Sequence, residues 1–134
     1  MQTTLLNGTN IKKAHRQGKD GTCEFNCWGT TLFILSQTDK LEWVGSTYMK
    51  PFLKNKTMPK VNQGFEKGDI LVLWGKAWYS DSDGVKHKEL IHTAVYVGNG
   101  KFFHKKGMNE SCYDTLEDVL HSYLHDNYEI RQLI

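Results

Sequence analysis

Cysteine is scarce in this chain: 134 residues contain only Cys23, Cys27 and Cys112, and their spacing forms no repeating framework. Three cysteines argue against a disulfide-stapled domain and favour a reducing compartment or at most one bridge. No apolar run is long enough to span a membrane, and residues 1–15 lack the apolar segment of a signal peptide. We therefore expect no membrane insertion and a cytoplasmic location by default, with a virion-associated or non-Sec exported protein as the alternative.

Excess charge is also lacking, because the formal net charge is only +2. This value is too small to predict nucleic-acid binding, and the loose lysine patch at 50, 54, 56 and 60 is expected to be a solvated surface. The sequence shows no internal repeat and no low-complexity tract. At this length we expect residues 1–134 to form one domain that buries roughly two-thirds of its unfolded surface and folds without metal or disulfides.

Helical patterns dominate the first half of the chain, and short β-rich runs dominate the second half. Apolar spacing predicts helices over 10–17, with Asn10 as N-cap, over 27–35, and near 46–54. Strands are expected at 69–75, 90–97 and 101–106, followed by a helix capped by Thr115 and a last strand, YEIRQLI. The core stripe of that last helix is expected to be Leu116, Val119, Leu120, Tyr123 and Leu124. Segregated helices and antiparallel strands predict an α+β fold.

The segment FNCWGTTLFIL, residues 25–35, places Cys27 at the start of a helix for which Asn26 is a good N-cap. The positive end of the helix dipole favours a thiolate at this position. A structural role is the competing interpretation, because free cysteine is among the most buried residue types. The helix alone leaves both open, so a nucleophile needs a partner elsewhere.

Two histidines interrupt apolar strands on either side of a Gly-Asn-Gly turn, His92 in IHTAVYV and His104 in KFFHK. A two-residue turn would pair Val95 with His104 and place the histidines on opposite faces of the sheet. A three-residue loop over 98–100 would instead pair Ala94 with His104, which makes His92 its diagonal neighbour on the same face. Each histidine alone has a structural interpretation as well, so cooperation between them requires the second register.

With that register the residues suit covalent catalysis by a thiol. Small Ala94 lies between the histidines and leaves room for the start of the Cys27 helix to approach the sheet. Cys27 would be the nucleophile, His92 the general base and His104 the residue that orients His92.

The blocks FNCWGTTLFIL, EKGDILVLW and HTAVYVGNGKFFHK resemble the signature blocks of NlpC-type cysteine peptidases, over about residues 25–105. These are papain-like enzymes that cut peptide bonds in bacterial cell-wall stem peptides. The resemblance implies a nucleophile helix packed on an antiparallel sheet, and the roles of Cys27, His92 and His104 just given. It also implies a peptide or peptidoglycan substrate, no cofactor and no metal. Without a secretion signal, a delivery partner would carry a phage-type or injected enzyme to its substrate.

Two neighbours of the cysteine depart from the family pattern, which usually has Asp and Ser where this chain has Asn26 and Trp28. We expect both to bind substrate. An amide removes the anionic partner for a stem-peptide amine, and an indole offers a stacking surface. The backbone N–H of Cys27 is the one oxyanion donor that the sequence predicts. An unusual substrate therefore stays open: an intracellular amidase, deamidase or acyl-transferase, or a catalytically silent binding protein on the same fold.

Other chemistry-bearing patterns are weaker. Cys27, His92 and His104 have the donor types of a zinc site, but no second pair of cysteines supports one. His121 and His125 have i, i+4 spacing without the Glu of an H-E-x-x-H motif, so a solvated helix face is expected. Trp74, Trp78 and Tyr79 could form the wall of a cleft, although packing in the core explains Trp74 at least as well. The segment WYSDSDG, residues 78–84, is interpreted as a β-turn or loop that could border the site.

Overall fold

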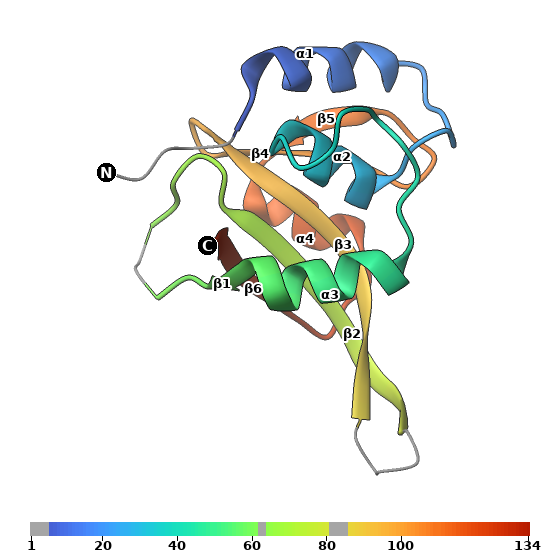
Figure 1. Ribbon diagram of the computed structural model, residues 1–134, viewed down its shortest axis with the longest axis vertical. Coiled ribbons are helices and arrows are strands. Elements are labelled where there is room, and N and C mark those ends of the chain that lie inside the picture. Colours follow the sequence, from blue (N-terminus) through green and yellow to red (C-terminus); the bar gives the residue numbers. More distant parts are fainter. Residues whose placement is uncertain (1–5, 62–63, 81–85) are drawn as a thin grey trace.

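The protein has an α+β fold, and the part of the chain that the computed structural model describes contains one six-stranded antiparallel sheet and four helices (Figure 1). The structure describes residues 6–61, 64–80 and 86–134, and within them the side chains outside 76–87. The elements follow the order α1 (Gly8–Gln17), α2 (Cys27–Ile34), α3 (Ser46–Lys56), β1 (Thr57–Pro59), β2 (Ile70–Ser80), β3 (Lys86–Gly98), β4 (Lys101–Lys105), β5 (Ser111–Asp114), α4 (Leu116–Ser122) and β6 (Asn127–Leu133).

The sheet has the strand order β1-β6-β2-β3-β4-β5 and is covered on both faces. In Figure 1, α2 and α3 lie on the near side of the sheet and α4 lies behind it. Alternate residues of β2 therefore enter two different cores, which explains why ILVLW reads as a continuous apolar run. One core joins α1, α2 and α3 to Ile70, Val72, Val95 and Phe103. The other joins Val119 of α4 to Leu71, Leu73, Ala94 and Phe102.

Several local expectations are confirmed and others are wrong. Thr115 caps α4 as predicted, because its hydroxyl accepts from the backbone N–H of Asp118 at 3.2 Å. The predicted cap Asn10 lies inside α1 instead, where its backbone N–H donates to Asn7, the actual N-cap. Leu124 is 97% exposed, because α4 ends at Ser122 and the predicted stripe does not continue.

The lysine patch is not uniformly solvated. The side chain of Lys60 is only 4% exposed and its Nζ lies 2.8 Å from Asp69 Oδ2. The hydrogen bond that Lys60 donates to Asp69 is the largest cause of a raised Lys60 pKa, which keeps the amine charged. A buried partner nine residues along the chain therefore removes this lysine from solvent.

The sequence did not predict two short strands, β1 and β5. Among the described residues, no helix is both long enough and apolar enough to cross a membrane. The predicted loop WYSDSDG is wrong for residues 78–80, which belong to β2, and residues 81–84 lie outside the described part, as do the side chains of Trp78 and Tyr79. Trp74 is half-buried, and its indole N–H donates to Glu129 at 2.7 Å.

Candidate active site

The start of α2 is fixed by the side chain of Asn26, which is buried with 7% exposure. Its Oδ1 accepts from the backbone N–H groups of Gly29 at 3.0 Å and Val44 at 3.1 Å. Its Nδ2 donates to the Val44 carbonyl at 2.7 Å, so one amide both caps the helix and holds the loop before α3. The predicted N-cap is therefore confirmed, while a substrate contact by Asn26 stays a prediction.

Gly29 lets that loop approach α2 closely. A Cβ at this position would lie 1.7 Å from the carbonyl oxygen of Glu42. The neighbouring Trp28 packs against the apolar core, and its buried indole N–H has no hydrogen-bond partner in the described part of the chain. Thr31, one turn further along, joins α2 to β3 through a 2.7 Å hydroxyl–hydroxyl contact with Thr93.

Cys27 lies half-buried where α2 meets β3. Burial raises the pKa of its thiol to about 11, although the backbone N–H groups of Thr93, Trp28 and Cys27 itself, with the charge of Lys105, act to lower it. The expectation that the helix start favours a thiolate is therefore wrong for the resting protein, because desolvation outweighs the aligned N–H groups. The same backbone groups and the Lys105 charge favour the anionic form of the thiol when it forms during a reaction.

The hairpin brings His92 and His104 together, with His92 Nε2 2.7 Å from His104 Nδ1. Gly98 pairs with Lys101 across a two-residue turn in which Asn99 and Gly100 both have positive φ. A bulge at Val97 then shifts the register, so the next pairs are Tyr96–Phe102 and Val95–Phe103. This is the register in which Ala94 faces His104. The shared face is as predicted, but a bulge and not a three-residue loop produces it.

A third member of this chain of hydrogen bonds, Asp114, was missed from the sequence. His104 Nε2 lies 2.9 Å from Asp114 Oδ2, and Lys106 Nζ lies 3.1 Å from the same oxygen. The carboxylate comes from β5, where Phe102 pairs with Asp114 and His104 pairs with Cys112, so all four side chains share a face. Burial acts to raise the Asp114 pKa, and the hydrogen bonds from His104 and Lys106 outweigh it and keep the pKa low.

These contacts fix the protons on both imidazoles. The ionised Asp114 can only accept, so neutral His104 carries its proton on Nε2 and presents a lone pair at Nδ1. His92 then donates from Nε2, which leaves its own Nδ1 as a lone-pair acceptor. Burial lowers the pKa of His92 well below its usual range, with further contributions from His104 and Lys106. Burial also lowers the pKa of His104, against the opposing effect of Asp114. Both rings are therefore neutral near pH 7.

The unused nitrogen, His92 Nδ1, is buried and has no hydrogen-bond partner among the described residues. The ring of Tyr123 stacks on His92 with 3.9 Å between centroids. Burial raises the pKa of Tyr123, and a Cys27 thiolate raises it further. His92 thus lies on the face of the sheet that α4 covers, together with Ala94 and Tyr123. The Cys27 helix α2 packs on the other face, where Thr31 contacts Thr93, and no hydrogen bond or ring contact between Cys27 and His92 is found among the described residues.

The positive charge of Lys105 also acts on the thiol. This lysine is fully buried, and its Nζ donates to the carbonyls of Gly107 at 2.7 Å and Asn109 at 2.8 Å. Burial lowers its pKa, and ionised Cys27 and Cys23 would raise it. A thiolate at Cys27 and the ammonium of Lys105 therefore stabilise each other.

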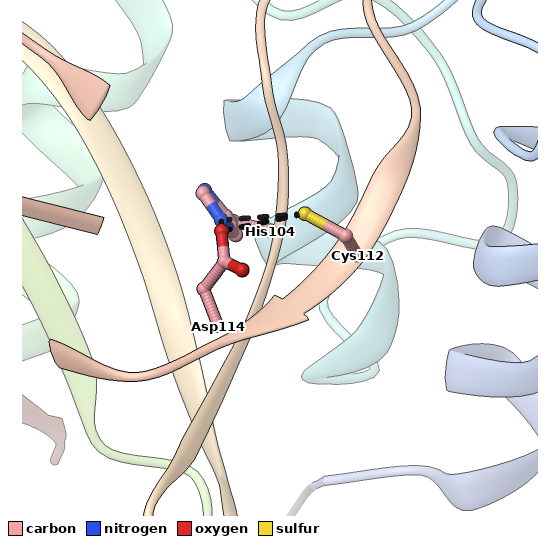
Figure 2. A group of neighbouring side chains, drawn as sticks. All are labelled: His104, Cys112 and Asp114. Atoms are coloured by element: carbon pink, nitrogen blue, oxygen red, sulfur yellow. Dashed lines mark hydrogen bonds and ion pairs between the residues drawn. The ribbon is translucent and has the colours of Figure 1, made fainter. Parts of the chain in front are cut away.

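Cys112 lies beside the histidine relay. Figure 2 shows its sulfur next to His104 and Asp114, at 3.6 Å from His104 Nε2 and 3.5 Å from Asp114 Oδ2. Within the described ranges these three residues form the group of metal-binding atoms that lie within 4.8 Å of one another, whereas Cys27, His92 and His104 do not form such a group. Burial and then the Asp114 charge raise the Cys112 pKa to about 11.

Comparison with family models found none that matches this chain, and a search of curated proteins found no match.

Proposed function

We propose that this protein is a thiol-dependent amide hydrolase with a papain-like arrangement of Cys27, His92 and His104. The observation that carries the proposal is the relay from Asp114 through His104 to His92, which ends in a buried, unpartnered Nδ1. A relay that holds one imidazole in the tautomer of a general base is the defining device of triad enzymes. A cysteine at the start of α2, the helix whose Thr31 contacts Thr93, the residue after His92 in β3, supports amide chemistry.

In the proposed reaction, Cys27 Sγ attacks a substrate carbonyl carbon while its proton passes to His92 Nδ1. The proton moves during the attack because the resting thiol has a raised pKa and the resting imidazole is neutral. Asp114 stabilises the imidazolium through His104, and the backbone N–H of Cys27 stabilises the oxyanion. His92 then protonates the leaving amine, and a water molecule that His92 deprotonates hydrolyses the acyl-enzyme.

Peptide or isopeptide bonds of peptidoglycan stem peptides are the proposed substrates. This choice follows from the resemblance to NlpC-type peptidases, and the Cys-His-His order is the same. A phage-type or injected enzyme of this kind would act with a delivery partner.

The test is incubation of purified protein with muropeptides, followed by mass spectrometry. We expect new fragments with free amines from the wild type and from Cys23→Ala, which removes an exposed thiol, and none from Cys27→Ala. If muropeptides stay intact while His92→Ala slows alkylation of Cys27, the bond belongs to another amide, as in an intracellular amidase, deamidase or acyl-transferase. A Cys27 whose alkylation is unchanged by His92→Ala would overturn the enzyme and favour a silent binding protein.

A further inference from the structure

We propose that His104, Cys112 and Asp114 form a zinc site whose occupancy switches His92 from an acceptor to a donor at Nδ1. The site itself is independent of the proposed function, whereas its inhibitory effect rests on that function. Neither the metal nor a role for Cys112 is part of the hydrolase mechanism above.

The three donor atoms already have nearly the spacing that zinc requires. Zn²⁺ bonds of about 2.3 Å to sulfur and about 2.0–2.2 Å to nitrogen or oxygen, at tetrahedral angles, separate the ligands by about 3.6 Å (S–N), 3.6 Å (S–O) and 3.4 Å (N–O). The corresponding distances are 3.6, 3.5 and 2.9 Å. Only the His104–Asp114 pair must open, by about half an ångström, for an ion to enter between the three atoms.

The backbone makes this arrangement rigid. His104 and Cys112 are directly paired across β4 and β5, and Asp114 is two residues beyond Cys112 on the same face (Figure 2). The side chain of His104 is fully buried, while that of Asp114 is 16% exposed, so the group opens to solvent on the β5 side. A histidine, a thiolate and a carboxylate leave the fourth tetrahedral position for water. Lys106, which now contacts Asp114 Oδ2, would move to the second carboxylate oxygen or to solvent.

Zinc binding would invert the relay. A neutral imidazole that binds metal through Nε2 carries its proton on Nδ1, so His104 would donate to His92 Nε2 instead of accepting from it. His92 would then keep its only proton on Nδ1, where the thiol needs a base. The protons balance: Cys112 releases one proton to solvent as it binds zinc, and each histidine moves one proton from Nε2 to Nδ1.

The binding test is a cobalt(II) titration of the full chain with Cys23→Ser and Cys27→Ala, which leaves Cys112 as the only thiol. We expect one equivalent of cobalt to give a thiolate-to-cobalt charge-transfer band and tetrahedral visible bands, both removed by zinc. Adding Cys112→Ser to this protein should abolish the charge-transfer band. Absence of the band, or its persistence without Cys112, would overturn the site.

The effect on His92 is measured separately, by long-range proton–nitrogen NMR of histidine-labelled protein and by Cys27 alkylation. Zinc should move the His92 proton from Nε2 to Nδ1 and slow alkylation by iodoacetamide at least tenfold. In the Cys112→Ser variant, Cys27 should be alkylated at the same rate with and without zinc. Slowing that persists in Cys112→Ser would mean that zinc binds Cys27 directly and would overturn the switch, as would an unchanged His92 tautomer. Muropeptide cleavage in the metal-free protein tests the hydrolase independently of both results.

Discussion

Replacing Asp114 by Asn tests whether the relay activates Cys27. The substitution keeps the shape of the side chain but removes the charge that His104 meets at 2.9 Å. Hydrogen bonds to charged groups contribute about 1.5–3 kcal/mol, and each 1.4 kcal/mol is a factor of ten. If most of this energy is expressed when His92 becomes an imidazolium, alkylation of Cys27 by iodoacetamide should slow by roughly 10- to 150-fold. The rate constant is measured at pH 7.5 by mass spectrometry of the peptide that contains Cys27.

Asp39→Asn is the matched control, because it removes the same charge from an exposed carboxylate and should leave the rate within about twofold. Thermal unfolding of both variants separates loss of activation from loss of structure. The histidine NMR spectrum gives a readout that a merely structural role would not change, since Asn can either accept or donate and no longer selects one tautomer. An Asp114→Asn protein with the wild-type rate and wild-type tautomers would refute the relay.

Two further predictions concern the helix start. Because burial raises the Cys27 pKa to about 11, its thiol is protonated below that pH. In His92→Ala, the rate of Cys27 alkylation should therefore rise about tenfold per pH unit from 7 to 10. A rate, measured on the Cys27 peptide, that reaches a plateau below pH 9 would contradict the raised pKa. Gly29→Ala should lower the free energy of unfolding by about 3 kcal/mol or more, because the added Cβ would clash with the Glu42 carbonyl. The control Gly8→Ala, whose Cβ would have open space around it, should change this free energy by less than about 1 kcal/mol. Denaturant unfolding measures both variants, and equal stabilities would contradict the close approach of the loop to Gly29.

Features set by a few neighbouring residues could be predicted from the sequence. Asn26 and Thr115 cap their helices because a side-chain oxygen two or three residues before a backbone N–H is a local arrangement. The Gly-Asn-Gly sequence likewise indicates a hairpin at this point, although Asn99 and Gly100 form a two-residue turn and not the three-residue loop that cooperation of the two histidines was predicted to require. Leu124 shows the limit of this approach: its apolar spacing continues the α4 pattern, but the chain leaves the helix two residues earlier.

The Asp114 end of the relay could not be predicted, because it depends on the pairing of β5 with β4. The sequence SCYD is short and mostly polar, so nothing local identifies Ser111–Asp114 as a strand. Only its register against β4 places Cys112 and Asp114 on the face of His104. The bulge at Val97 is equally invisible locally, although it decides that His92 and His104 meet. The alternation of Cys112 and Asp114 was the one available signal, and it has meaning only once a partner strand is known.

The contacts of Asn26 require an amide at this position, where the proposed resemblance to NlpC-type peptidases would place a carboxylate. A carboxylate could accept from the N–H groups of Gly29 and Val44, but it could not donate to the Val44 carbonyl, which Asn26 Nδ2 reaches at 2.7 Å. An Asp here would therefore bury a charge against an unpaired carbonyl oxygen, at a cost that the loop before α3 would have to absorb. The loop and the amide thus form one structural unit in this chain. In the proposed peptidase, another carboxylate would have to bind a substrate amine. Asn in place of Asp at residue 26 would therefore change the choice of substrate, while the relay proposed to activate Cys27 would stay the same.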